Sequence, residues 1–246
     1  MNRIIAGRQP VMEALRAGTE IEKVVFLIGV HGRVIDDIKS LALKRNVQVA
    51  EVARQEFRDI ASDATTQGVV ALVSGQQQYV ELETLLHIPG ERNQNGLLLI
   101  LDEIEDPHNL GALVRTAECA GVHGVIIPKH HSASVTSAVA KASAGAVEHM
   151  AIAEVTNIVN TIKALKENGY WIIGLESTGI RLYTEADYRT PTAIVVGSEG
   201  KGIRRLVKEQ CDFLVKIPLH GKIASLNASV AGALAMYEAA KQRSTS

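Results

Sequence analysis

The nine residues Ile194–Gly202 read IVVGSEGKG. An apolar run too short for a helix is followed at once by a segment with three glycines in six residues. This pattern predicts a buried strand that ends in a ligand-binding turn, because glycine lets a bound molecule approach backbone N–H and C=O groups without a Cβ in the way. Between the glycines, Ser198, Glu199 and Lys201 supply a hydroxyl, an anion and a cation. A turn that only reverses the chain does not need these polar side chains.

Two common phosphate-binding motifs do not fit this turn. A P-loop needs a serine or threonine where this chain has Gly202, and its first glycine would fall at Val195. A dinucleotide-binding fingerprint needs a further glycine where the chain has Arg205. The carboxylate of Glu199 would also repel a pyrophosphate. The turn therefore predicts a less anionic ligand that is held through backbone atoms.

Composition indicates an ordinary soluble globular protein. The chain has 246 residues, of which 46% are apolar, enough for one large or two modest domains. No apolar stretch approaches the roughly 18 to 20 residues of a membrane span, and no signal-peptide core is present, so a cytoplasmic location is expected. Cys119 and Cys211 have no metal-type spacing. We expect both to be small buried side chains and expect no metal site.

The net charge of −1 lacks the overall positive charge that is typical of nucleic-acid-binding proteins. Any such contact must come from a local cluster of cations. One candidate cluster lies in the predicted helix Ile203–Glu209 and just before it. Its members recur at helical spacing, which would place all four on one face: Lys201, Arg204, Arg205 and Lys208. This face is either a solvated surface or a contact for nucleic acid.

The pattern of strands and helices divides the chain into two α/β domains. Residues 1–75 predict a small α/β/α unit, and residues 76–96 are polar and glycine-bearing, as in an interdomain linker. Residues 97–246 alternate strands with helices, which predicts a parallel sheet covered on both faces. Ligands of such sheets bind at the carboxyl ends of the strands. Three polar loops are expected to meet there: 102–109, 197–202 and 218–227.

The first and third of these loops carry candidate functional residues. Asn109 lies where we expect the N-cap of the helix Leu110–Ala120, and its amide could instead face a substrate. Arg115 follows on that helix, which should be largely buried, so its guanidinium needs an anion. That anion is either Asp102 or Glu103, or else an RNA phosphate or a reacting oxygen.

In the third loop, Ser225 and Asn227 are both capable of capping the last helix. One cap is enough for one helix. The second polar side chain therefore exceeds the structural need and is available to a ligand.

The three loops together resemble the signatures of SpoU-type RNA ribose 2′-O-methyltransferases, which belong to the SPOUT class. Residues 109–117 read NLGALVRTA, residues 197–202 read GSEGKG and residues 217–231 read IPLHGKIASLNASVA, in the family's order and spacing. The N-terminal unit resembles an L30-type RNA-binding domain, so the resemblance covers nearly the whole chain. Within the family it is greatest to the bacterial 23S ribosomal RNA guanosine-2′-O-methyltransferases, through DPHN at 106–109, ASAGA at 142–146 and QGVVA at 67–71.

The resemblance implies a fold that patterns of hydrophobicity could not reach. In this class the C-terminal segment threads through a loop to form a deep trefoil knot, in which S-adenosyl-L-methionine lies bent. The adenine and ribose of this cofactor would contact the chain at four matching positions: Gly197, Ile217, Leu219 and Leu226. The family also forms homodimers whose active sites use both subunits.

The resemblance also implies catalytic roles. Arg115 matches the family's catalytic arginine, which has been assigned as a general base. A guanidinium is effectively always protonated, so we favour the hypothesis that it binds a phosphate and stabilises the developing alkoxide. Asn109, Glu199, Ser225 and Asn227 would orient the arginine, shape the turn and place the ribose. Two alternatives remain: a transfer-RNA ribose 2′-O-methyltransferase, and a non-catalytic RNA-binding ribosome-assembly factor.

Overall fold

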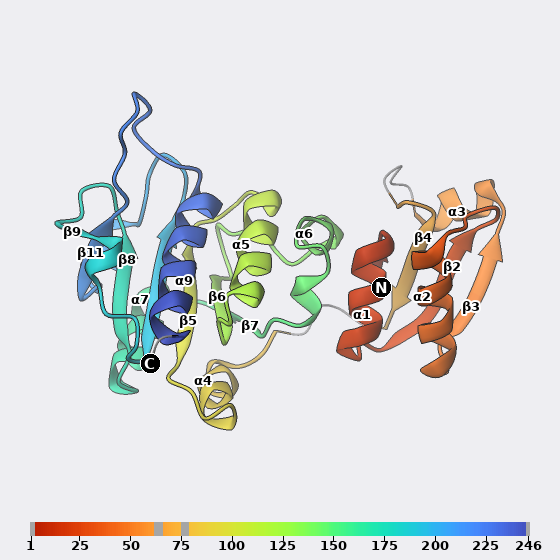
Figure 1. The fold of residues 1–246 in the computed structure, drawn as a ribbon, viewed down its shortest axis with the longest axis horizontal. Helices are drawn as coiled ribbons and strands as arrows, with labels where there is room; N and C mark the ends of the chain where they lie inside the picture. Colours follow the sequence, from red (N-terminus) through yellow and green to blue (C-terminus); the bar gives the residue numbers. More distant parts are fainter. Residues whose placement is uncertain (1–2, 62–65, 75–78, 245–246) are drawn as a thin grey trace. The chain divides into compact units, whose positions relative to one another are not determined.

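A computed structural model describes residues 3–61, 66–74 and 79–244 of the chain (Figure 1). The chain divides into two compact units. The first comprises residues 1–78 and 134–149, and the second comprises residues 79–133 and 150–246. The chain therefore passes from one unit to the other three times.

The first unit is built on a mixed sheet with strand order β1-β4-β2-β3. Strand β4 runs antiparallel to β1 and β2, and β3 runs parallel to β2. Helices α1 and α2 pack on one face of the sheet and α3 packs on the other, as the predicted α/β/α pattern requires. The elements are β1 (Arg3–Ala6), α1 (Arg8–Ala17), β2 (Ile21–Leu27), α2 (Arg33–Lys44), β3 (Gln48–Val52), α3 (Arg54–Ile60) and β4 (Val69–Val73).

A second segment of the chain, residues 134–149, completes this unit. It contains the helix α6 (Ser137–Ala142) and the 3₁₀ turn η1 (Ala146–Glu148). Both carboxylate oxygens of Glu148 accept hydrogen bonds of 2.9 Å from the guanidinium of Arg3, and the hydroxyl of Thr19 donates a third. The Glu148 side chain is only 3% exposed, and a carboxylate can be buried this far only with such partners.

These boundaries differ from those that we expect from the sequence. Residues 134–149 interrupt the stretch 97–246, because the pairing of Glu148 with Arg3 joins positions far apart in the chain. In the expected linker 76–96, residues 76–78 lie outside the described residues. From residue 79 onward the chain is part of the second unit, where the helix α4 (Leu82–Glu91) buries Leu85 completely in the core.

The second unit is a parallel sheet with strand order β7-β6-β5-β10-β8-β11-β9. All residues of the adjacent strands β5 and β10 are buried. The predicted parallel sheet is confirmed, whereas the knot stays a prediction. The elements are β5 (Leu97–Asp102), α5 (Pro107–Cys119), β6 (Gly124–Pro128), β7 (Ile152–Val155), α7 (Ile158–Glu167), β8 (Trp171–Leu175), β9 (Arg181–Leu182), η2 (Tyr183–Glu185), β10 (Thr192–Gly197), α8 (Arg205–Lys208), β11 (Phe213–Lys216) and α9 (Ala228–Ser244).

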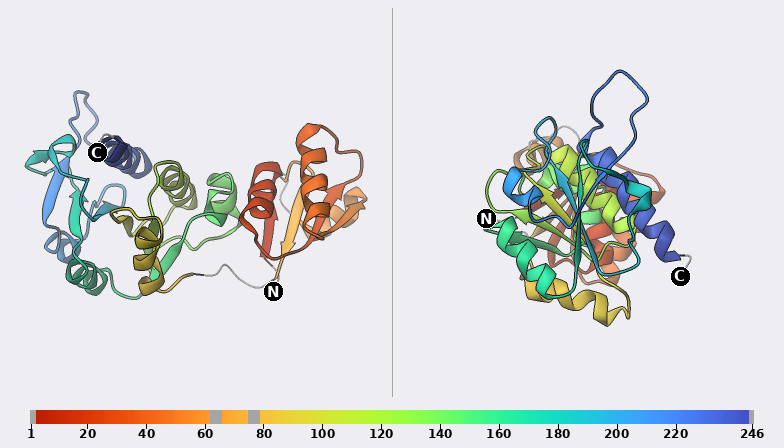
Figure 2. Two further views of the ribbon diagram at one scale, coloured as in Figure 1. Left: turned by 60° about the horizontal axis from the view of Figure 1, so that its bottom comes forward. Right: turned by 90° about the vertical axis from the view of Figure 1, so that its left-hand side faces the viewer.

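Helices cover both faces of this sheet (Figure 2). On one face, Val195 belongs to the same buried cluster as the apolar residues of α4 and α7. On the other face, Val196 lies against Gly232 of α9, which also packs on α5. Because the strands are parallel, the loops after β5, β8, β10 and β11 all leave the sheet at one edge.

The two cysteines differ in their burial. Cys211 is partly buried, but Cys119 is exposed at the end of α5, so the prediction of two buried cysteines is wrong for Cys119. The last turn of α5 turns this residue away from the core. Among the described residues, no helix has the length and apolar character that crossing a membrane requires.

Candidate functional site

The glycine turn folds back so tightly that its first glycine touches its last. The backbone N–H of Gly202 donates a 2.9 Å hydrogen bond to the carbonyl of Ser198. A Cβ placed on Gly197 would lie 2.2 Å from the carbonyl carbon of Gly202 and 2.3 Å from the backbone nitrogen of Ile203. Gly200 and Gly202 have φ angles of 83° and 67°, in the left-handed region that favours glycine. Gly197 is therefore required by steric contact, and Gly200 and Gly202 are favoured by their backbone conformation.

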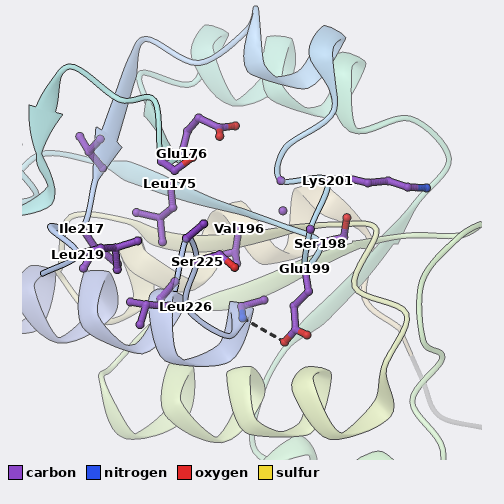
Figure 3. A pocket seen from close by; sticks show the side chains of 18 residues that line it. Leu175, Glu176, Val196, Ser198, Glu199, Lys201, Ile217, Leu219, Ser225 and Leu226 are labelled. Atoms are coloured by element: carbon purple, nitrogen blue, oxygen red, sulfur yellow. Dashed lines mark hydrogen bonds between the residues drawn. The ribbon is translucent and has the colours of Figure 1, made fainter. Parts of the chain in front are cut away.

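A cavity of about 370 Å³ lies between this turn and the loops that follow β8 and β11 (Figure 3). This volume is within the range of small-molecule sites. The structure brings all four predicted cofactor-binding residues to its wall: Gly197, Ile217, Leu219 and Leu226. In Figure 3 the side chains of Leu175, Ile217 and Leu226 lie toward one end of the cavity and Glu199 toward the other.

Glu199 is the centre of a polar network at the rim of the cavity. Its Oε1 accepts a 3.0 Å hydrogen bond from the Nδ2 of Asn109 and further hydrogen bonds from the Nδ2 of Asn227 and the backbone N–H of Ala228. The Nδ2 of Asn227 also donates to the Oδ1 of Asn109 at 2.9 Å. Two predicted side chains, Asn109 in the first turn of α5 and Asn227 just before α9, therefore meet at the carboxylate of a third, Glu199.

Asn227 is the N-cap of α9. Its Oδ1 accepts hydrogen bonds from the backbone N–H groups of Ser229 and Val230, at 2.9 Å and 3.3 Å. Ser225, the other candidate cap, lines the cavity instead, and no residue in the described part of the chain hydrogen-bonds its hydroxyl. The serine hydroxyl is thus available to a ligand.

Asn109 does not cap its helix, so that part of the prediction is wrong. Helix α5 starts earlier, at Pro107, and its N-cap is Asp106, whose carboxylate accepts a 2.9 Å hydrogen bond from the backbone N–H of His108. A proline at the first helical position is preorganised for a helix start, and it moves the boundary. The amide of Asn109 is consequently free to bind Glu199.

Arg115 lies on the exposed side of α5, and it forms no ion pair with any residue that the structure describes. The alternative of an ion pair with Asp102 or Glu103 is therefore wrong, although the apolar face of α5 is buried as expected. Both carboxylates pair with Arg204 instead. Arg115 does not join the network of Glu199, since it lies six residues beyond Asn109, about 9 Å along the helix axis.

Asp102 joins the glycine turn to the end of β5. Its side chain is completely buried and accepts 2.8 Å hydrogen bonds from the backbone N–H and the guanidinium Nε of Arg204. The hydrogen bond to Asp102 also raises the pKa of Arg204, so the cation is retained. A buried carboxylate requires such compensation, and the pair holds the residues after Gly202 in place.

The predicted basic face of one helix is wrong. Helix α8 spans only Arg205–Lys208, so Lys201 and Arg204 precede it. Arg204 pairs with Asp102. The two cations inside α8 also pair with acids at 2.5 Å, Arg205 with Glu209 and Lys208 with Glu176. Three of the four cations therefore serve at least in part as structural partners.

Sequence reasoning missed Glu176, which follows β8 and lines the cavity. Its side chain is only 10% exposed, and its Oε2 lies 3.2 Å from the position that a Cβ on Gly202 would take. The signal was an acidic residue directly after a buried strand, at the same edge as the glycine turn. Among the described residues, no cluster of histidine, cysteine and acidic side chains could hold a metal ion.

A second cavity, of about 240 Å³, adjoins the first. The two cavities share Ser198, Glu199 and Lys201 as lining residues. Asn109 and the acidic loop 103–106 complete the wall of the second cavity. The Glu199 network therefore lies where two adjacent ligands could meet, one in each cavity.

The sequence matches two protein-family models. Residues 96–237 match the SpoU rRNA Methylase family, and residues 4–79 match the family of RNA 2′-O ribose methyltransferase substrate binding. Two similar proteins are named "Putative TrmH family tRNA/rRNA methyltransferase". One, YacO of Bacillus subtilis, is 41% identical over 239 residues, 97% of this chain and 95% of that protein. The other, from Staphylococcus saprophyticus, is 43% identical over 240 residues, 98% of this chain and 96% of that protein.

A solved structure shares the fold of the whole chain. It is the SpoU methyltransferase AviRb from Streptomyces viridochromogenes in complex with the cofactor AdoMet. The TM-score is 0.81 at 23% sequence identity, and the match covers 100% of this chain and 92% of that one. At this identity the likeness shows the fold.

The contact at Gly197 predicts the effect of one added methyl group. In Gly197→Ala the new Cβ would overlap backbone atoms, which cannot move aside without opening the turn. We expect the free energy of unfolding, measured by urea titration, to fall by about 1–3 kcal/mol. The control is Gly90→Ala in α4, where nothing lies within 4 Å and φ is not positive; its stability should be unchanged or slightly raised. Equal midpoints for the two variants would contradict the proposed constraint.

Proposed function

The chain belongs to the SpoU rRNA methylase family, and we propose that it transfers a methyl group from S-adenosylmethionine to a ribose 2′-hydroxyl of RNA. The observation that carries this proposal is the position of Glu199, which Asn109 and Asn227 hold between two cavities. The first cavity would take the methyl donor and the second the target nucleotide. AviRb, which has the same fold, is a methyltransferase crystallised with AdoMet.

The residues of the first cavity fit this cofactor. An adenosine is neutral and has an apolar face, and the wall offers Leu175, Ile217 and Leu226 together with backbone that the glycines leave bare. The carboxylate of Glu199, whose hydrogen-bond donors are all neutral, supplies negative charge near a positively charged ligand. When bound, S-adenosylmethionine supplies a methyl group on a sulfonium, which is a good leaving group.

The chain's own residues then have to place and activate the hydroxyl. In the reaction a bond forms between the ribose 2′-oxygen and the methyl carbon, the carbon–sulfur bond breaks, and the hydroxyl proton leaves to water or to a neighbouring group. Holding the oxygen in line with the methyl group is the main requirement. We propose that the Asn109–Glu199–Asn227 network fixes the turn and that the Ser225 hydroxyl hydrogen-bonds the ribose.

We propose that Arg115 binds a phosphate next to the target ribose and stabilises the developing alkoxide. Its exposure and its lack of an acidic partner among the described residues support this role, because an unpaired guanidinium matches phosphate geometry. We propose an active site that includes a second copy of the chain, as the resemblance to the SpoU-type enzymes implies.

A homodimer is part of the proposal. Helix α9 exposes three apolar side chains at spacings of four and three residues: Val230 at 46%, Leu234 at 38% and Tyr237 at 55%. This spacing gives one stripe on the helix. An exposed apolar stripe is typical of a protein–protein contact, and a second copy would cover it.

For the substrate we propose a guanosine of 23S ribosomal RNA, modified in the cytoplasm, with transfer RNA as the alternative. The support is the resemblance to the 23S enzymes in three short motifs; the names of the relatives mention both RNAs. The first unit would bind the RNA, since it matches the substrate-binding family. Of the four cations near the turn, Lys201 has no acidic partner among the described residues and the side chain of Arg205 is 77% exposed, and we propose that these two reach RNA.

A transfer assay tests this function. The protein is incubated with S-adenosylmethionine that carries a tritiated methyl group, and with unmodified transcripts of 23S ribosomal RNA or transfer RNA. We expect label in the 23S transcript, at a nucleotide whose 3′ phosphodiester resists alkaline hydrolysis because its 2′-oxygen is blocked. Label in transfer RNA alone would favour the alternative substrate. Label in neither RNA would contradict the function and favour a binding factor.

Two variants that each remove an N-cap distinguish an effect on the functional site from an effect on overall stability. Asn227→Ala and Asn157→Ala each remove an N-cap, from α9 and α7 respectively, so each should lower the free energy of unfolding by about 1 kcal/mol. Only Asn227 also holds Glu199. We therefore expect methyl transfer to fall roughly 10- to 100-fold in Asn227→Ala and to stay unchanged in Asn157→Ala. Equal activities in the two variants would exclude the proposed role of Asn227.

The proposed role of Arg115 requires a guanidinium and not only a charge. Arg115→Lys keeps the charge but loses the planar pair of donors that binds phosphate. We expect kcat/KM for RNA to fall about 10- to 100-fold, while the dissociation constant of the cofactor, measured by calorimetry, stays unchanged. A variant that keeps most of its turnover would rule out an essential guanidinium.

A further inference from the structure

The three parallel strands of the first unit end at one edge of its sheet. Strands β1 and β2 both run antiparallel to β4, and β3 runs parallel to β2. The carboxyl ends of β1, β2 and β3 therefore face the same way, and a helix follows each of them, after one residue for α1 and α3 and after five residues for α2. The residues that begin α1, α2 and α3 lie along this single edge.

Each of the three helices begins with an arginine: Arg8 in α1, Arg33 in α2 and Arg54 in α3. A cation is unfavourable at the N-terminus of a helix, because the helix dipole gives the N-terminus a partial positive charge that favours acidic side chains. Stability therefore does not explain three arginines at equivalent positions.

These arginines are not used inside the folded unit. Arg33 and Arg54 are exposed, and neither forms an ion pair or hydrogen bond through its side chain with any residue in the described ranges. Arg8 donates its Nε only to the neutral backbone carbonyl of Gln67, at 3.3 Å. Of the other arginines of this unit, Arg3 and Arg16 pair with glutamates, whereas Arg58 in the last turn of α3 is also exposed and has no ion pair among the described residues. Exposed guanidinium groups without an acidic partner at one edge are available to an anion from outside.

The arginine edge, defined as Arg8, Arg33 and Arg54, is the surface of the first unit that we propose binds the sugar–phosphate backbone of the RNA substrate. This inference rests on the proposed function and says where the substrate-binding unit holds RNA. The outer strands β1 and β3 are three strand spacings apart, roughly 14 Å. An edge of this length can contact several successive phosphates, and guanidinium groups bind phosphate well. Such contacts would give affinity without reading the base sequence.

The test removes two charges from the edge and two from elsewhere in the same unit. Arg33→Gln/Arg54→Gln alters the arginine edge, and the matched control Lys23→Gln/Lys44→Gln alters the opposite side, at the start of β2 and the end of α2. Both full-length variants have the same net charge. Binding of an unmodified 23S ribosomal RNA transcript is measured by filter retention over a range of salt concentrations, together with methyl transfer.

We expect the edge variant to bind RNA about tenfold more weakly than the control. The slope of log K against log salt should become shallower by about 1.4, since each single-strand phosphate contact contributes about 0.7. KM for RNA should rise, while kcat and the cofactor affinity stay unchanged. The melting temperature of the edge variant should stay the same or increase, so a loss of binding would not come from unfolding.

The outcomes separate this inference from the proposed function. If the unaltered protein methylates RNA but both double variants bind RNA with the same affinity and the same salt slope, the arginine edge is not the RNA surface. If the control loses as much binding as the edge variant, overall charge and not this edge determines affinity, and the inference is also wrong. If the unaltered protein neither binds nor methylates any RNA, the proposed function and this inference fail together.

Discussion

The close approach of Gly197 to Gly202 and Ile203 is the constraint on which the site depends. With contacts near 2.2 Å for any added Cβ, the turn closes only if residue 197 has no side chain. Closure places Glu199 beside the start of α9 and leaves backbone exposed along the cavity. The same closure gives Arg204 its position over the buried Asp102, so the end of β5 and the end of β10 are fixed together. The absence of a side chain at residue 197 thus allows the turn to close, and the polar contacts of Glu199 and Arg204 depend on that closure.

Two carboxylates in the second unit show how burial decides the role of an acid. The side chain of Asp102 is completely buried and both of its oxygens accept hydrogen bonds from Arg204, so its role is to stabilise the fold. Glu199 is exposed, and its Oε1 accepts from two amides and the first N–H of α9. Neutral donors and a helix N-terminus stabilise an anion without cancelling its charge. The charge at Glu199 therefore remains available to a ligand, whereas the charge at Asp102 does not.

The parts of the fold that sequence could predict are those with a local cause. The helices Arg8–Ala17 and Ile158–Glu167 and the strand Trp171–Leu175 have such a cause, because hydrophobic periodicity and a following glycine are local signals. The glycine turn and its cavity were predictable for the same reason. The place of residues 134–149 was not, because the bond between Arg3 and Glu148 joins distant parts of the chain.

The errors in the candidate site have one physical origin, which also bears on RNA binding. Helical spacing suggested that Arg204 and Lys208 were free, but the fold supplies Asp102 and Glu176 as their partners. A net charge of −1 likewise suggested weak attraction for RNA, yet many acids are bound to cations within the fold. What an RNA phosphate meets is the set of cations that the fold leaves unpaired. A nearly neutral chain can therefore bind a polyanion where its structure leaves arginines without an acidic partner.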